Sequence, residues 1–265
     1  MPYVEAAGAR VAYRVAGSGP GVVLVHGTGG SAETSWPEMI DRLTSRWTVV
    51  RVDFAGSGDS VDGGGPLDLA ALAAQVVAAA QDAGVGRFHL LGFSLGAVIA
   101  VKIAADHPDK LLSVVPLAGM LSSADPRLQM QLRLWRHLID SDREAMTRLG
   151  MLTCFSPDYI ARFDAGTLEQ AMADDLAGTD WDALARQVDL DLTLDVTQEA
   201  ARIAVPALVI GCRHDQIVPP VRHARVLADR IPGALYAELD CGHCAPFEVP
   251  DALIDLAEPF WRKSG

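Results

Sequence analysis

Two short motifs in this chain contain residues that could carry out nucleophilic chemistry. GFSLG (92–96) matches G-x-S-x-G around Ser94, and CGHC (241–244) holds His243 between two cysteines. A serine hydroxyl becomes a nucleophile when an imidazole accepts its proton and a third group orients that imidazole. The pair therefore indicates acyl transfer, provided that the fold brings the two motifs together.

CGHC also matches C-x-x-C, the dithiol of thiol–disulfide oxidoreductases. Such an enzyme would place the first cysteine at a helix N-terminus in a small βαβ domain. Here the motif follows the last predicted strand of a larger sheet, and the next helix is delayed until Pro250. We therefore interpret Cys241 and Cys244 as reduced neighbours of the site, and His243 as its general base.

The local context of Ser94 supports the role of nucleophile. A predicted strand, 87–93, comes before it, and a predicted helix, 95–106, follows it. A sharp turn from strand to helix strains the backbone of the serine and leaves no room for side chains on either side, which explains the two glycines. The turn also exposes the hydroxyl at a helix N-terminus, where developing negative charge is favoured.

A glycine-rich loop, HGTGG (26–30), follows the first buried strand and can direct a backbone N–H at a substrate oxygen. We predict that the N–H groups of Thr28 and Leu95 form an oxyanion hole. We interpret His26, at the start of the loop, as a residue that braces it rather than as a base.

The acid and the base each follow a predicted strand. Asp215 ends the run 206–215, and His243 follows the run 234–240. The carboxyl ends of parallel strands meet at one edge of a sheet, where ligands bind in open α/β folds. We therefore predict that Asp215 orients His243, and that both lie beside Ser94.

Strand and helix patterns alternate through most of the chain, which predicts an α/β fold with a mostly parallel sheet covered on both faces. Residues 10–17 are expected to form an early edge strand, and Ser35 with Glu38 is expected to form a capping box. From about 122 to 200 the pattern is helical throughout, which indicates an insertion that could cover the carboxyl edge of the sheet.

Composition narrows the possible partners and the compartment. The net charge of −12 and the pI near 4.9 argue against nucleic acid and anionic membranes. No secretory signal or membrane-spanning run is evident, and four cysteines in such a chain indicate reduced thiols in the cytoplasm. No metal site, dinucleotide motif or Walker motif is found, so no cofactor is expected. We expect a small-molecule substrate; monomer and homodimer both remain open.

Together the motifs resemble those of the serine hydrolases with the α/β-hydrolase fold. HG-x-G at 26–29, D-x-x-G-x-G-x-S at 53–60, G-x-S-x-G and the final aspartate and histidine occur in the family's order over nearly the whole chain. The resemblance implies a hydrolase core formed by 1–121 and 201–265, with 122–200 as a helical cap.

The resemblance also implies roles for single residues. Asp53 is expected to brace a loop, and Ser94 argues against the members that open epoxides or displace halide, which carry an aspartate as nucleophile. Some members take the acid from the loop after an earlier strand, so Asp125 remains the minority candidate beside Asp215.

Apolar residues of the cap, with one residue beside the nucleophile, predict a substrate pocket with little provision for charge. The candidates are Phe93, Met130, Leu134, Trp135, Met151 and Phe155. The expected enzyme is a carboxylic ester hydrolase that cleaves an ester or lactone of a small, largely apolar substrate. A C–C bond hydrolase, a thioesterase or acyltransferase, and a non-catalytic ligand-binding protein are the alternatives.

The two interpretations of CGHC predict opposite outcomes for two substitutions. If the imidazole acts, His243→Ala abolishes turnover of an activated ester, whereas Cys241→Ser leaves it near the wild-type rate. Steady-state assays of both variants provide the check. Loss of activity in Cys241→Ser together with survival in His243→Ala would assign the chemistry to sulfur.

Overall fold

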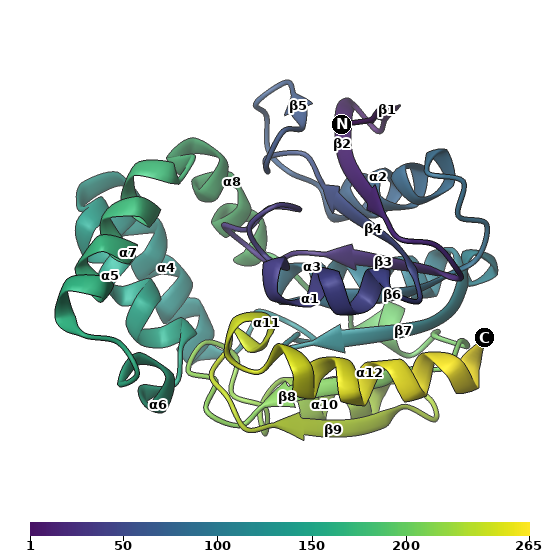
Figure 1. Cartoon of the computed structure of the whole chain (residues 1–265). Helices are drawn as coiled ribbons and strands as arrows, with labels where there is room; N and C mark the ends of the chain where they lie inside the picture. The colour runs from purple at the N-terminus through teal and green to yellow at the C-terminus, as the bar shows by residue number, and fades with distance from the viewer.

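The computed structural model describes residues 1–265, and its centre is a nine-stranded sheet (Figure 1). The order in space is β1-β2-β4-β3-β6-β7-β8-β9, and β5 pairs with β2. Only the pairs β1–β2, β2–β4 and β2–β5 are antiparallel, so the mostly parallel sheet is confirmed. The strands are β1 (Tyr3–Ala6), β2 (Ala9–Ala16), β3 (Gly21–Val25), β4 (Thr48–Asp53), β5 (Val61–Asp62), β6 (Phe88–Phe93), β7 (Leu111–Leu117), β8 (Leu208–Cys212) and β9 (Leu235–Leu239).

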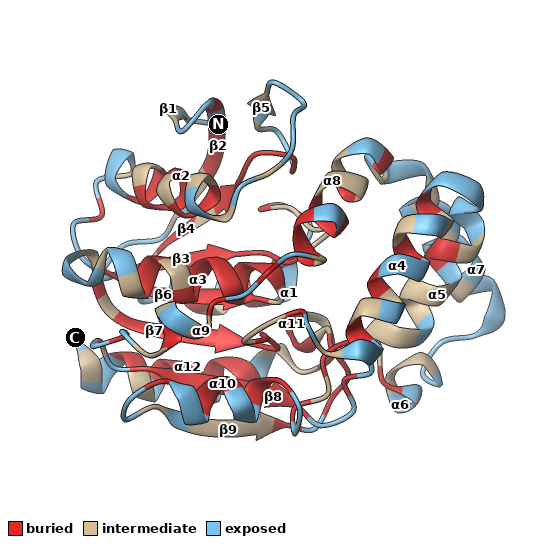
Figure 2. Ribbon diagram, turned by 180° about the vertical axis from the view of Figure 1, so that it is seen from behind, coloured by how far each residue is buried: buried red, intermediate tan, exposed pale blue.

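Helices cover both faces of the sheet, with α1 and α12 on one side and α2, α3 and α10 on the other (Figures 1 and 2). Successive strand residues point to opposite faces. Val22 and Leu24 therefore join one apolar cluster with α1 and α12, while Val23 and Val25 join another with α2 and α3. The helices are α1 (Pro37–Thr44), α2 (Leu69–Asp82), α3 (Leu95–Asp106), α10 (Ala224–Arg230), α11 (Ala245–Glu248) and α12 (Pro250–Ser264).

The segment between β7 and β8 is helical, as its pattern predicts. Figure 1 shows α4, α5 and α7 to one side of the sheet, with α8 nearest its strands. These helices are α4 (Pro126–Ser141), α5 (Arg143–Cys154), α6 (Pro157–Ile160), α7 (Ala165–Gly178), α8 (Trp181–Asp191) and α9 (Thr197–Ala200). Side chains that cap α4, α5, α7 and α8 come from Asp125, Asp142, Asp164 and Asp180. Residues 122–200 form the segment called the cap. That this segment is a unit separate from the core remains a prediction. None of the helices is long and apolar enough to cross a bilayer.

Two local predictions were wrong. The strand β2 is not at the edge, because a tight turn through Ala7 and Gly8, both with positive φ, folds β1 back along its outer side. The helix α1 has no capping box, because its N-cap is Trp36 rather than Ser35, and no side chain caps it. The fully buried Trp36 indole packs edge-on against Phe93, which fixes where this helix begins.

Asp53 ends β4 and braces the loops around it. One carboxylate oxygen accepts the N–H of Ala32 at 2.6 Å, and the other accepts the N–H of Asp59 and a guanidinium N–H of Arg14, both at 3.2 Å. Gly58 is required here because a Cβ on it would lie 2.2 Å from the Asp53 carboxyl carbon. The fully buried carboxylate thus joins three segments of chain.

This network predicts a specific loss of stability. Asp53→Ala removes a buried charge and leaves its donors unpaired, so the free energy of unfolding should fall by about 3 kcal/mol. Asp59→Ala is the matched control, because that half-exposed carboxylate also pairs with Arg14 and should cost less than about 1 kcal/mol. Urea unfolding measures both, and equal losses would contradict the bracing role of Asp53.

Candidate active site

Ser94 lies in a strained turn between β6 and α3. Its φ is 57° and its ψ is −117°, in a region that side-chain-bearing residues rarely occupy. A Cβ on Gly92 would lie 2.0 Å from the Gly96 carbonyl oxygen, and one on Gly96 would lie 2.1 Å from the Val25 oxygen. Only glycines allow α3 to begin this close to β6 and β3. The Ser94 hydroxyl makes no cap hydrogen bond to its own helix.

The structure brings Ser94, His243 and Asp215 into one hydrogen-bonded chain. His243 Nε2 lies 2.9 Å from Ser94 Oγ, and His243 Nδ1 lies 2.7 Å from Asp215 Oδ2. A carboxylate only accepts hydrogen bonds, so Nδ1 carries the proton and Nε2 is free to accept the serine proton. Asp215 Oδ1 accepts the N–H groups of Ile217 and Val218, which fix the carboxylate in place.

Asp215 and His243 are shielded from water, each 4 % exposed, whereas Ser94 is only half-buried. Burial on its own lowers the pKa of His243, but the charge of Asp215 and the hydrogen bond to it outweigh burial and raise that pKa above its ordinary value. The imidazole is therefore a stronger base than a free one, and its charged form is stabilised.

The loop 26–30 lies against the serine turn. A Cβ on Gly27 would be 2.7 Å from the Ser94 Cβ, so the loop can touch the turn only through a glycine. The N–H groups of Thr28 and Leu95, the predicted oxyanion donors, make no hydrogen bond to another loop or side chain. They remain available to a substrate oxygen.

His26 is fully buried and makes no hydrogen bond to the Ser94 hydroxyl. Its Nδ1 donates to the Gly27 carbonyl oxygen at 2.8 Å, its Nε2 lies 3.0 Å from Ser57 Oγ, and its ring stacks on Phe54. Burial lowers its pKa. It therefore stays neutral and holds the loop.

Helix α8 of the cap contacts the same loop through two side chains. Gln187 accepts the N–H of Gly29 at 2.8 Å, and Asp191 Oδ2 accepts the Thr28 hydroxyl at 2.6 Å. Gln187 also donates to the Gly56 carbonyl oxygen. The cap thus fixes the loop that carries one of the two candidate oxyanion donors.

The loop that carries His243 is held by Glu248. Its buried carboxylate accepts the N–H of Gly242 at 3.0 Å and the N–H of Ser156 at 2.9 Å. A Cβ on Gly242 would collide with Ser156 and Glu248, so this glycine is needed for the close approach. The general-base candidate is therefore tied to the cap at Ser156.

The cysteines of CGHC do not face each other as a redox pair. Cys241 interacts with Cys212 of β8, and Cys244 interacts with Cys154 at the end of α5; all four are free thiols. The contact with Cys154 and burial raise the pKa of Cys244 well above its usual value. The same contact, with the charge of His243, lowers the pKa of Cys154, so the more nucleophilic thiol of this pair is Cys154 of α5 and not a cysteine of CGHC.

A small cavity of about 80 Å³ lies beside Ser94 and His243. Ten of its fourteen lining residues are hydrophobic, and none is lysine or arginine. The predicted pocket residues Phe93 and Trp135 line it together with Leu128 and Leu132 of α4. The candidate nucleophile therefore borders a small, mostly apolar space.

Four predicted pocket residues lie elsewhere. Met130 and Leu134 are 69 % and 45 % exposed, because α4 turns Leu128, Leu132 and Trp135 inward and these two outward. Met151 on α5 does not line the cavity, and Phe155 instead stacks on Tyr159.

The remaining acid candidate is also excluded by position. Asp125 caps the N-terminus of α4 and forms an ion pair with Arg222 at 2.7 Å. It makes no hydrogen bond to His243, which takes Asp215 instead.

Asp191 was missed by sequence reasoning, although it lines the cavity and is 5 % exposed. Burial raises its pKa to about 7, while the Thr28 hydrogen bond and the charge of His243 lower it. The available signal was helical spacing, which places Asp191 on the buried face of α8 with Trp181, Leu184 and Val188.

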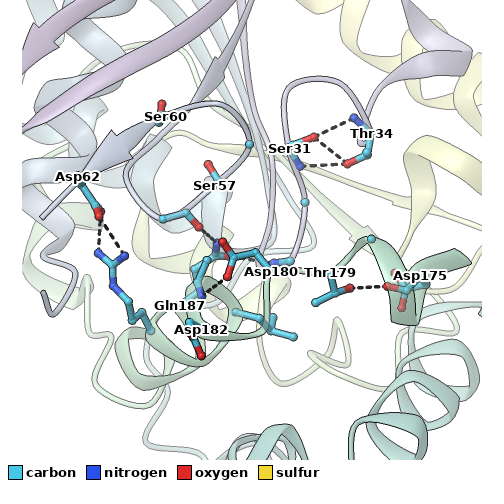
Figure 3. Close-up of a pocket in the computed structure, with 18 of the residues that line it drawn as sticks. Ser31, Thr34, Ser57, Ser60, Asp62, Asp175, Thr179, Asp180, Asp182 and Gln187 are labelled. Carbon is cyan, nitrogen blue, oxygen red and sulfur yellow. Dashed lines mark hydrogen bonds and ion pairs between the residues drawn. The ribbon is translucent and has the colours of Figure 1, made fainter. Parts of the chain in front are cut away.

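A larger, polar cavity of about 750 Å³, drawn in Figure 3, borders Gly29 and Gly30 of the loop 26–30. Its walls include Gly29, Ser57 and Gln187, together with Asp62, which pairs with Arg186 at 2.6 Å. Ser94, Asp215 and His243 do not line it. The cavity that contacts the candidate nucleophile is the small apolar one.

Comparison with known proteins shows the family and the fold of this chain. A family model described as the alpha/beta hydrolase fold matches residues 20–250. The chain is 46% identical over 260 residues to a Xenorhabdus hominickii protein named pyrrolizixenacetamide deacetylase, and the match covers 98% of this chain and 97% of that protein.

Solved structures of similar fold include two hydrolases. An enol-lactonase from Burkholderia xenovorans LB400 has a TM-score of 0.87 at 26% identity, covering 98% of this chain and all of that one (100%). A hydrolase from Pseudomonas aeruginosa PA01 has a TM-score of 0.85 at 25% identity, covering 98% and 97%.

The hydrogen bond between Asp215 and His243 predicts a measurable shift. Asp215→Asn removes the charge that raises the pKa of His243, so that pKa should fall below its value in the wild-type protein. Titration of the imidazole signals by NMR measures this. Asp240→Asn is the matched control, because that exposed carboxylate contacts His214 and not His243. An unchanged pKa of His243 in Asp215→Asn would contradict the proposed pairing.

Proposed function

The chain belongs to the alpha/beta hydrolase family and is a hydrolase of that type, and we propose that it removes a small acyl group from its substrate through an acyl-enzyme on Ser94. The observation that carries the proposal is the chain Ser94–His243–Asp215 beside a small apolar cavity. We propose these three residues as the catalytic triad, with Thr28 and Leu95 as oxyanion donors.

In the first half-reaction, Ser94 Oγ attacks the substrate carbonyl carbon while its proton passes to His243 Nε2. The carbonyl oxygen becomes an oxyanion and accepts hydrogen bonds from the N–H groups of Thr28 and Leu95. Asp215 stabilises the imidazolium that forms. His243 then gives the proton to the leaving oxygen or nitrogen, and the bond to the carbonyl carbon breaks.

In the second half-reaction, water replaces the leaving group. His243 takes a proton from the water as its oxygen attacks the acyl carbon on Ser94. The second tetrahedral intermediate collapses, His243 returns the proton to Ser94 Oγ, and the carboxylic acid leaves. The enzyme is restored without any cofactor taking part.

The size and walls of the cavity support a short acyl group, such as acetyl. The walls next to Ser94 come from Phe93, Leu132 and Trp135, and the space of about 80 Å³ between them favours a short chain over a long one. The match to a protein named pyrrolizixenacetamide deacetylase supports extending the bond class from esters and lactones to amides. Since His243 can protonate a leaving nitrogen, the same residues serve both bonds.

The other hydrolase reactions that share this triad differ in what the cavity must hold. A thioesterase or acyltransferase for acyl carriers needs room for the pantetheine arm of the carrier, and a C–C bond hydrolase needs room for a ring-fission product. The short, apolar space beside Ser94 favours neither.

A substrate panel distinguishes these reactions. Among p-nitrophenyl esters, kcat/KM should be highest for acetate or propionate and fall by about ten-fold or more by octanoate, because longer chains do not fit the cavity. The acyl-CoA of the same chain length and a vinylogous diketone serve as comparison substrates. A rate that rises with chain length, or turnover of only the acyl-CoA or the diketone, would contradict the proposal.

A further inference from the structure

The cavity beside Ser94 contains one charged group that the triad does not use. Asp191 is the last residue of α8, it is 5 % exposed, and it lines the cavity together with Ser94, His243 and Thr28. The other side chains of the wall are mostly apolar, and none is lysine or arginine. A carboxyl group in such surroundings needs a partner.

The two oxygens of Asp191 are unequally satisfied. Oδ2 accepts the Thr28 hydroxyl at 2.6 Å, whereas Oδ1 is buried and has no hydrogen-bond partner in the protein. Leaving a buried polar atom unpaired costs about 1–3 kcal/mol, and more when it is charged. A hydrogen-bond donor in a bound substrate would remove that cost.

We propose that Asp191 Oδ1 accepts the N–H of a secondary amide at the scissile bond, which makes Asp191 the residue that selects amides over esters. This inference rests on the proposed function of Ser94. An ester has no hydrogen at that position and would place an oxygen lone pair against Asp191. An amide N–H satisfies the unpaired oxygen.

The same contact would strengthen during the reaction. When the first tetrahedral intermediate collapses, His243 protonates the leaving nitrogen, which becomes more positive before the C–N bond breaks. A carboxylate at hydrogen-bond distance stabilises that charge more than it stabilises the neutral amide. Asp191 thus acts on the poorer of the two leaving groups.

The ionisation of Asp191 is compatible with this role. Burial raises its pKa to about 7, so the carboxylate form is accessible at slightly alkaline pH, where the assays below are run. The neighbouring groups are the Thr28 hydroxyl and the His243 imidazole, whose positive charge favours the ionised form of Asp191.

The test compares p-nitroacetanilide with p-nitrophenyl acetate, which differ at the scissile bond. Asp191→Asn keeps an oxygen for the Thr28 hydroxyl but replaces the free acceptor with a donor. It should lower the amide-to-ester ratio of kcat/KM by about ten- to hundred-fold. Thr28→Val is the matched control, because it removes the hydroxyl partner of Oδ2 and retains the backbone N–H. If each variant lowers kcat/KM for the amide and for the ester by the same factor, Asp191 only positions the loop, and the proposal is overturned.

A second measurement is made on the wild-type enzyme and does not depend on whether a variant folds. N-methyl-p-nitroacetanilide lacks the N–H, so the wild-type enzyme should hydrolyse it about ten-fold or more slowly than p-nitroacetanilide. If Asp191→Asn folds, the fall in rate caused by N-methylation should be smaller in that variant than in the wild type. This comparison separates the lost N–H contact to Asp191 from the steric effect of the methyl group. Equal losses in both proteins, or a wild type that cleaves only the ester, overturn the role of Asp191.

The outcomes also separate this inference from the function on which it rests. If wild type hydrolyses neither substrate, or if Ser94→Ala retains the wild-type rates, the function proposed for Ser94 fails. If wild type hydrolyses both through Ser94 and the amide-to-ester ratio is the same in Asp191→Asn, only the role of Asp191 fails.

Discussion

The close approach of α3 to the central strands at the Ser94 turn is the constraint on which the site depends. Gly92 and Gly96 have no room for a Cβ, and Ser94 accepts an unfavourable backbone conformation between them. The strain is maintained because β6 lies between β3 and β7, deep in the sheet. In this conformation the Ser94 hydroxyl makes no hydrogen bond to α3 and lies within hydrogen-bond distance of His243, which follows β9.

The cap contributes to the site as well as covering it. Buried side chains of α8 accept hydrogen bonds from Thr28 and Gly29. Glu248 accepts the N–H of Ser156 in the cap and the N–H of Gly242 in the loop that carries His243. A change in how the cap packs would therefore alter both the oxyanion loop and the base. These contacts therefore link the cap to both loops of the proposed active site.

Most of the candidate site could be predicted from the sequence, because its residues follow the carboxyl ends of recognisable strands. Ser94, Asp215 and His243 each follow a strand, so a parallel sheet places them at one edge whatever the details. Which face of α4 is buried could not be predicted, because its apolar residues allow more than one choice. These residues are Leu128, Met130, Leu132, Leu134 and Trp135. The packing of α4 against α8 and α5 decides which face is buried. Asp191 was missed for a related reason, since a helical aspartate is usually exposed and tertiary contacts alone bury this one.

The central claim is that an acyl group passes through Ser94, and trapping that intermediate tests it most directly. The enzyme is mixed with p-nitrophenyl acetate, quenched in acid during turnover, digested and analysed by mass spectrometry. The account predicts one acetyl group on the peptide that contains Ser94, and none on that peptide in Ser94→Ala. Rapid hydrolysis by the wild type with no acetyl group at Ser94, or with the acetyl group on Cys154 or Cys244, would contradict it.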